Sequence, residues 1–345
     1  MALPESGSRF IRNQVERLWR LPRRMRVVFP EGNDARVYSA AVRLAGEGLL
    51  EPVLIGRPPA RISAGIRYVD PGESADTPRY AALLYERRRS KGLTEADAPE
   101  AARTDLNFGT LMVAAGDADA LVGACVYTSA EFTRAMLACL GLRPGFGRLS
   151  SVHYLAVQNR KCGCDGMIAF ADAAIQIDPN PRELAEIAVT AAESVRAVLD
   201  VEPLVALLSL STKGSAQHPR VTKVVEAYEI VRKMAPDLRV DGELQADAAL
   251  SSFVGQKKSP GSAVAGYANT LIFPDLDSAN IAYKLVERLG DAALMAVLLL
   301  GLRKPAAIIS RGCTEEDAYH TALTTALQAA AESDATAAES VSYAR

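Results

Sequence analysis

The segment from Ser310 to Asp317 combines a hydroxyl, a guanidinium and carboxylates around a glycine. It follows a short apolar run, Ala306–Ile309, of the kind that forms a buried strand in an α/β sheet. Thr314 and the acidic residues after it predict the start of a helix. Ligands of open α/β sheets bind at the carboxyl ends of strands, where Arg311 would bind phosphate and Asp317 could accept a proton.

The same residues also have a purely structural explanation. Thr314 and Asp317 have the spacing of a capping box, in which the acidic partner occupies the third helical position. Acidic residues in a first turn also complement the helix dipole. This segment alone therefore leaves both interpretations open.

A second polar group follows the predicted strand Leu121–Val126. Thr128 and Ser129 lead into a predicted helix, Ala130–Leu142, whose N-terminal amides would face an anion. Arg134 lies about one turn inside that helix. Anion binding and helix capping are equally consistent with this pattern.

Cations gather at the end of the predicted helix Pro78–Lys91, directly before Gly92. A helix C-terminus attracts cations for electrostatic reasons alone. The same density of charge, Arg88 included, would also suit a polyanionic ligand.

A loop rich in hydroxyl groups follows the predicted strand Leu204–Leu208. Its residues predict a cradle for a phosphate or a carbonyl group, and the candidates are Ser211, Thr212, Lys213, Gly214 and Ser215. The order of glycine, lysine and hydroxyl residues is not that of a Walker A loop. By contrast, the loop Phe29–Arg36 requires no chemistry, because Asp34 would cap the next helix and Gly32 would permit a tight turn.

Short apolar runs alternate with helical patterns along most of the chain, which predicts a parallel sheet flanked by helices. Val152–Val157 and Met167–Phe170 look like neighbouring strands joined by a polar turn, and Leu244–Phe253 reads as a helix. No G-x-G-x-x-G follows a strand, which argues against a nicotinamide-binding Rossmann domain.

Composition narrows the class of protein. The 345 residues suffice for two domains or one large one, and 49% hydrophobic with 23% charged residues is ordinary for a soluble globular protein. A net charge of −2 gives no electrostatic case for a nucleic acid or an anionic membrane as partner. No apolar stretch approaches the roughly 20 residues of a spanning helix, and no signal peptide is visible, so we expect a cytoplasmic enzyme. The five cysteines and three histidines are dispersed, so no metal site is expected and no Ser-His-Asp arrangement is legible.

Taken in order, these segments resemble the phosphate acetyltransferase (phosphotransacetylase) family, within the wider acetyl/butyryl phosphotransferase group. The resemblance runs from about Arg26 to Ala330. The segments that carry it are Phe29–Val37, Tyr85–Gly92, Phe108–Met112, Ser209–Ala216, Asp241–Ala248, Ser259–Asn269, Leu271–Leu276, Asn280–Lys284 and Ser310–Cys313. Each segment is weak evidence by itself, whereas the ordered series is specific.

The resemblance implies an α/β protein with two three-layer α/β/α domains, an inter-domain cleft and a fold like that of isocitrate and isopropylmalate dehydrogenases. The first domain would be discontinuous, formed by residues 1–148 plus 291–345, and the second would hold residues 149–290. The implied activity is reversible transfer of acetyl between acetyl-CoA and phosphate, giving acetyl phosphate and CoA. Coenzyme A is then a substrate, no prosthetic group or metal is needed, and a homodimer is expected.

The resemblance also implies roles for individual residues. Asp317 matches the proposed general base, which would remove the proton from the CoA thiol, while Ser310 would orient that thiol. Arg311 would hold phosphate and offset negative charge that builds in the transition state. Arg88 and Arg134 match arginines assigned to CoA or phosphate, and the two hydroxyl-bearing strand-end loops would contribute further substrate contacts.

Three positions depart from the family pattern. Leu300, Ala307 and Ile308 stand where a Gln, an Asn and an Asp are usual. Loss of a complete polar set within a core strand can be nearly neutral. The alternatives are a phosphate butyryltransferase-like enzyme for longer acyl groups, and a non-catalytic paralogue that binds CoA.

Overall fold

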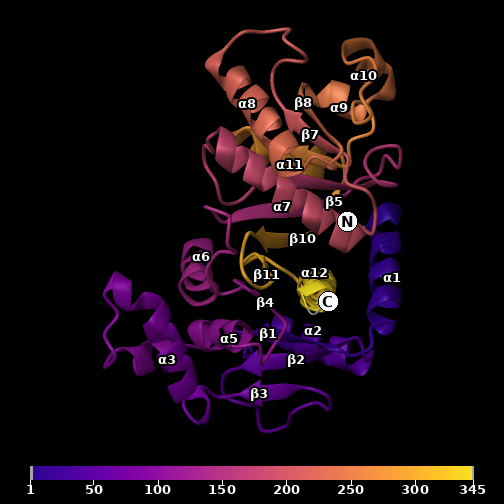
Figure 1. Cartoon of the computed structure of the whole chain (residues 1–345). Helices are drawn as coiled ribbons and strands as arrows, with labels where there is room; N and C mark the ends of the chain where they lie inside the picture. Colours follow the sequence, from indigo (N-terminus) through magenta and orange to yellow (C-terminus); the bar gives the residue numbers. More distant parts are fainter. Residues whose placement is uncertain (1–2, 344–345) are drawn as a thin grey trace. The chain divides into compact units, whose positions relative to one another are not determined.

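The computed structural model describes residues 3–343, and it divides into two compact units (Figure 1). One unit joins the start of the chain, up to Arg12, to Gly145–Gly301. The other joins Asn13–Pro144 to the chain from Leu302 onward. Helix α1 (Glu5–Trp19) contributes to both units, because the division falls within it.

The unit built on Asn13–Pro144 contains a parallel sheet of order β3-β2-β1-β4-β11. Its central strands are short and almost entirely buried, as in a sheet covered on both faces. The strands are β1 (Met25–Phe29), β2 (Leu50–Ile55), β3 (Arg67–Val69), β4 (Ala120–Gly123) and β11 (Ala306–Ile308).

Two groups of helices pack on this sheet. Helices α2 and α12 pack against each other and on the sheet, whereas α5 packs with α3 and also contacts β1, β2 and β4. Gly109 of α5 permits a close approach, since a Cβ there would lie 2.9 Å from Val28 of β1. The helical segments are α2 (Ala35–Gly46), α3 (Thr77–Arg88), the 3₁₀ turn η1 (Arg89–Lys91), α4 (Ala98–Ala102), α5 (Asp105–Ala114), α6 (Ser129–Ala135), the π-helical η2 (Met136–Leu140) and α12 (Glu315–Tyr343).

The unit built on Gly145–Gly301 contains a mixed sheet of order β10-β5-β6-β9-β7-β8. Strands β10, β5 and β6 pair antiparallel, and the remaining pairs are parallel. The strands are β5 (Ser150–Ala156), β6 (Met167–Ala171), β7 (Val205–Leu208), β8 (Val240–Leu244), β9 (Thr270–Ile272) and β10 (Ala293–Leu300). The helices are α7 (Pro181–Leu199), α8 (Pro219–Met234), α9 (Ala246–Leu250), α10 (Ser252–Lys258) and α11 (Leu276–Leu289).

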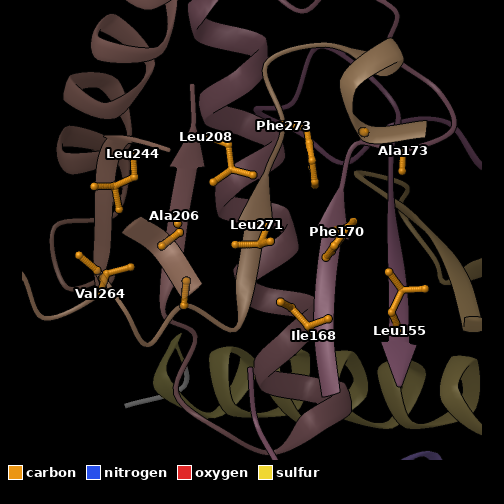
Figure 2. Packing of buried hydrophobic residues seen from close by; sticks show 14 residues of the cluster. Leu155, Ile168, Phe170, Ala173, Ala206, Leu208, Leu244, Val264, Leu271 and Phe273 are labelled. Carbon is orange, nitrogen blue, oxygen red and sulfur yellow. The ribbon is translucent and has the colours of Figure 1, made fainter. Parts of the chain in front are cut away.

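One apolar cluster occupies a face of this sheet (Figure 2). Pairs two residues apart, such as Ile168 with Phe170 and Ala206 with Leu208, point to the same side because side chains alternate along a strand. Helix α11 covers this cluster with Ala279 and partly buried neighbours. Helix α7 lies behind the strands in the same view, so this unit has three layers.

The predicted α/β class is confirmed, and so are most of the predicted elements. The strands predicted at Val152–Val157 and Met167–Phe170 correspond to β5 and β6. The predicted helix Leu244–Phe253 is wrong: Leu244 still belongs to β8, and two short helices, α9 and α10, follow it. The strand predicted to reach Val126 ends at Gly123, because Ala124 has a φ of 83°, outside the range of a strand.

The pairing of strand β10 concerns the predicted domain bound at residue 291. It pairs along its length with β5, from Ala293 opposite Ala156 to Leu300 opposite Ser150. It therefore lies in the unit that contains Gly145–Gly301, while the sequence-based bound at residue 291 assigns it to the other domain. The domain bounds themselves stay a prediction.

The described residues, 3–343, contain neither a membrane-spanning helix nor a cluster of metal ligands. No helix in that range is long and apolar enough to cross a membrane. No group of three or more His, Cys, Asp or Glu side chains in the same range is arranged to hold a metal ion.

A histidine lies in the interior of the Gly145–Gly301 unit. His153 on β5 is 3% exposed, and its ring centroid lies 4.8 Å from that of Tyr283 on α11. Its Nδ1 has no hydrogen-bond partner among the described residues. Burial lowers the pKa of His153 to about 3, with a smaller contribution from Lys284, because a charged ring would have no compensating partner.

We predict that His153→Leu makes the free energy of unfolding depend less on pH below roughly pH 6.5. In the unfolded chain this histidine binds a proton below roughly pH 6.5, whereas in the folded chain it stays neutral down to about pH 3. Its contribution to the free energy of unfolding is therefore complete above roughly pH 6.5 and is lost as the pH falls. The free energy of unfolding should lose up to about 1.4 kcal/mol per pH unit in this window, and His153→Leu should remove that slope. Denaturant titrations from roughly pH 7 to pH 5 measure it.

The control variant is His218→Asn. His218 is exposed and accepts a hydrogen bond from the Arg220 amide at the start of α8, which Asn can replace. This variant should keep the wild-type slope. A wild-type slope in His153→Leu as well would show that the buried ring is not its source.

Candidate active site

Three neighbouring strands of the Asn13–Pro144 unit end at one edge of its sheet. Strands β1, β4 and β11 are adjacent and parallel, so the loops that follow them emerge together. The loop after β4 carries Thr128 and Ser129, and the loop after β11 carries Ser310 and Arg311. The structure thus brings together two groups of predicted site residues that are far apart in the sequence.

Asp317 forms a capping box at the start of α12. Its Oδ2 accepts hydrogen bonds from the Thr314 amide at 2.7 Å and from the Thr314 hydroxyl at 2.9 Å. The Thr314 hydroxyl accepts in return from the Asp317 amide at 3.2 Å. The structural explanation of this spacing is therefore correct, and among the described hydrogen bonds Oδ1 stays outside the box.

The start of α6 repeats this arrangement. Thr128 and Glu131 form a second capping box, with the Glu131 carboxylate 2.8 Å from the Thr128 amide. The Thr128 hydroxyl lowers the pKa of the Glu131 carboxyl most, and Arg134 and Arg311 lower it further. Two of the predicted anion-binding arginines, from different elements, therefore act on one carboxylate.

Arg88 is the last residue of α3 and is half-buried. Burial raises the pKa of the Cys139 thiol to about 12, and the charges of Arg87 and Arg88 oppose this rise. Cys139 lies in η2, which continues directly from α6, the helix that carries Arg134. Helix α3, which ends at Arg88, packs against η2, and a contact of Arg88 with substrate stays a prediction.

The hydroxyl-rich loop after β7 belongs to the unit of Gly145–Gly301. Glu243 at the end of β8 organises it, because its Oε1 accepts from the Ser211 hydroxyl at 2.8 Å and from the Gly214 amide at 2.7 Å. Ser211 and Thr212 are buried, whereas Gly214 and Ser215 are exposed. The exposed half of the loop is therefore the part that remains open to a ligand.

Lys213 is held within the same loop. Its ammonium donates to the Asp241 carboxylate and, at 2.8 Å, to the Gly242 carbonyl. Its φ of 49° places the backbone in the left-handed region, which the contacts on either side maintain. The lysine charge is thus compensated by Asp241, and the cradle predicted from the sequence depends on acidic residues that the sequence analysis did not assign to it.

Glu31 is another residue that the sequence analysis missed. Its buried carboxylate accepts from the amides of Ala124 at 2.9 Å, Val126 at 2.7 Å and Tyr127 at 3.2 Å. It therefore fixes the loop after β4 that leads to Thr128. Its sequence signal is its place in the Phe29–Arg36 loop, next to Gly32. The two roles predicted nearby are confirmed: Asp34 caps α2, and Gly32 lies in a tight turn that the Asp34 amide closes onto the Glu31 oxygen at 3.0 Å.

The three apolar departures all lie in strands. Leu300 ends β10 and is 2% exposed, and Ala307 in β11 is fully buried beside Val122 of β4. Ile308 pairs with Gly123 and is partly exposed. These apolar side chains suit core strands, and of the three Ile308 is the one with substantial exposure.

Three comparisons relate the chain to known proteins. A family model described as Phosphate acetyl/butaryl transferase matches residues 10–326. The phosphate acetyltransferase of Thermoanaerobacterium thermosaccharolyticum is 40% identical over 311 residues, which covers 88% of this chain and 95% of that protein. A phosphotransacetylase from Streptococcus pyogenes superimposes with a TM-score of 0.86 at 41% identity, over 94% of this chain and 98% of its own.

A more distant structure shares the fold alone. It is a branched-chain phosphotransacylase from Enterococcus faecalis, with a TM-score of 0.64 at 19% identity, covering 88% of this chain and 99% of its own. The predicted fold is confirmed by these superpositions.

The Thr314 capping box yields a stability prediction. Thr314→Ala removes the hydroxyl that caps α12 and should lower the free energy of unfolding by about 1 kcal/mol. Thr314→Ser keeps a capping hydroxyl and should stay within about 0.5 kcal/mol of the wild type. Denaturant unfolding of both variants measures this difference, and equal stabilities would show that the box contributes nothing.

Proposed function

The chain belongs to the Phosphate acetyl/butaryl transferase family, and on this premise we propose that it transfers acetyl reversibly between acetyl-CoA and phosphate, giving acetyl phosphate and CoA. One observation carries the proposal: the chain matches a phosphate acetyltransferase at 40% identity along 95% of that protein. The Ser310–Asp317 segment, at the carboxyl end of β11, supplies the residue types that the reaction needs.

In the proposed reaction the CoA thiol attacks the carbonyl carbon of acetyl phosphate, and phosphate leaves. Asp317 is the general base that takes the thiol proton, since a thiol with a reference pKa near 8.5 needs help to ionise at neutral pH. Its Oδ1 is the oxygen for this task, because Oδ2 is engaged by Thr314. Ser310 orients the thiol by a hydrogen bond.

Arg311 holds the phosphate group and offsets the charge that develops on the carbonyl oxygen and the leaving group. Its influence on Glu131, shared with Arg134, supports an anion site near the start of α6. Arg88 and Arg134 bind the phosphates of CoA or inorganic phosphate, with Thr128 and Ser129 as neighbouring donors. Both substrates react directly, so orientation supplies much of the rate and no acyl-enzyme is formed.

The remaining substrate contacts are proposed for the loop after β7. Ser211, Thr212, Lys213, Gly214 and Ser215 form this group. Of its exposed members, Gly214 and Ser215 would touch substrate, while Lys213 is paired with Asp241. The proposal includes acetate metabolism in the cytoplasm, a homodimer, and neither a metal nor a prosthetic group. CoA, acetyl-CoA, phosphate and acetyl phosphate are its small-molecule partners.

A second candidate function follows from the apolar departures. Leu300, Ala307 and Ile308 replace polar residues of the family pattern, which favours a longer acyl group such as butyryl. A protein that binds CoA without turnover is the remaining alternative.

Acyl-CoA consumption in the presence of phosphate or arsenate separates these functions. We expect kcat/KM for acetyl-CoA to exceed that for butyryl-CoA by about tenfold or more, since each methylene added to a fitted pocket changes binding by about 1–3 kcal/mol. A preference for butyryl-CoA would select the second candidate. Binding of both acyl-CoA molecules with no turnover of either would leave only the non-catalytic protein.

Asp317→Asn tests the proposed base. Removing a general base should lower kcat by roughly 10²–10⁴-fold, while the amide oxygen can still accept a hydrogen bond from Thr314 and preserve the fold. Thr314→Ala serves as the control, because it disrupts the same box and keeps the carboxylate. Turnover near that of the wild type in Asp317→Asn would remove Asp317 from the mechanism.

A further inference from the structure

Arg36, in the first turn of α2, donates hydrogen bonds to protein acceptors from every nitrogen of its guanidinium group. Nε donates to Asp34 Oδ1 at 3.0 Å, and Nη2 donates to Asp34 Oδ2 at 2.8 Å. Nη2 also reaches the Cys125 carbonyl at 3.2 Å. Nη1 donates to the carbonyls of Arg311 at 2.8 Å and Cys313 at 3.1 Å. All five N–H donors of a guanidinium are thereby engaged.

This network fixes the orientation of the guanidinium. Asp34 binds its edge through two oxygens, and the same carboxylate caps α2 by accepting from the Arg36 amide at 2.9 Å. A bidentate pair of this kind defines a plane as well as a position. The remaining donors therefore point in directions set by the start of α2.

The two carbonyls that Nη1 binds flank Gly312, in the loop that presents Ser310 and Arg311. Pairing of β11 with β4 ends with the Ile309 amide on the Gly123 oxygen at 2.8 Å. Beyond it, the Cys313 amide closes a turn onto the Ser310 oxygen at 2.9 Å, and the side chains of Ser310 and Arg311 are exposed. Arg36 thus holds the backbone of this turn at two points after the strand has ended.

The third carbonyl extends the network to the loop after β4. Cys125 lies between Ala124 and Val126, whose amides bind Glu31. Glu31 and Arg36 both come from the segment that follows β1. One short segment therefore holds the loop that leads to Thr128 and the loop that carries Ser310.

We propose that Arg36 is a positioning residue for the acyl transfer: through the carbonyls of Arg311 and Cys313 it sets the orientation of Ser310 and Arg311 toward the substrates. It does not bind substrate itself, because its donors are all engaged in the protein. This inference rests on the proposed function. Lysine, with one ammonium, cannot reproduce contacts that diverge from a planar fork.

The test compares Arg36→Lys with Arg43→Lys. Arg43 lies on the same helix, binds Glu47 at 3.0 Å and Glu316 of α12 at 2.6 Å, and stacks 3.9 Å over the Tyr319 ring. Its described contacts do not include the carbonyls of the Ser310 turn. The control therefore removes an arginine that joins α2 to α12 and leaves the turn anchored.

Arg36→Lys should lower kcat by about 10–100-fold with KM for acetyl-CoA and phosphate changed by less than about threefold, since small misplacements of catalytic groups reduce turnover strongly. Hydrogen exchange of the amides from residue 310 to residue 314 should become faster in this variant. Arg43→Lys should keep kcat within about twofold and leave that exchange unchanged. Thermal unfolding of both variants confirms that the folded protein is compared.

A value of kcat within about twofold of the wild type in Arg36→Lys, or an equal fall in both variants, would overturn the inference. If Arg36→Lys does not fold, Asp34→Asn replaces it, since Asn preserves the helix cap and loosens one side of the fork. That variant should show the same faster exchange with a smaller fall in kcat, and unchanged values of both would overturn the inference. If the wild type consumes no acyl-CoA, the proposed function fails, and the exchange data alone decide whether Arg36 holds the turn.

Discussion

The loops at the carboxyl edge of the β1-β4-β11 strands depend on a single physical constraint: backbone groups that leave the ladder of a sheet must find other partners. Glu31 accepts from the amides of the loop after β4, and Arg36 donates to the carbonyls of the loop after β11. A carboxylate and a guanidinium thus satisfy the two kinds of unpaired backbone group. Charge-assisted hydrogen bonds are stronger than neutral ones, so the loops are defined although they have little regular structure.

In the Gly145–Gly301 unit, acidic side chains likewise accept hydrogen bonds from the backbone of loops that follow strands. Glu243 gathers the loop after β7, and Asp172, at the end of β6, accepts from the amides of Ala174 at 3.0 Å, Ile175 at 3.1 Å and Gln176 at 2.9 Å. Burial raises the pKa of Asp172, and these hydrogen bonds oppose the rise. In both units an acidic residue close to the end of a strand organises a neighbouring loop.

Local patterns predicted the elements that carry the site, and long-range contacts could not be predicted. The apolar run before Ser310 predicts the strand, and the spacing of Thr314 and Asp317 allows the cap that the structure contains, because each pattern involves few residues. The hydrogen bond from Arg36 to Cys313 joins residues 277 positions apart. The periodicity of apolar residues along the sequence does not predict such a long-range contact. The Leu244–Phe253 error has the same cause, since helical spacing does not reveal that Leu244 pairs with Leu208 of a neighbouring strand.

The capping box at α12 has a stereochemical consequence for the proposed base. Because Oδ2 of Asp317 accepts two hydrogen bonds from Thr314, Oδ1 is the oxygen left for the proposed proton transfer from a sulfhydryl. Thr314 thereby determines which carboxylate oxygen remains available in the proposed reaction. A capping motif found in many proteins thus restricts access to the carboxylate that we propose as the base.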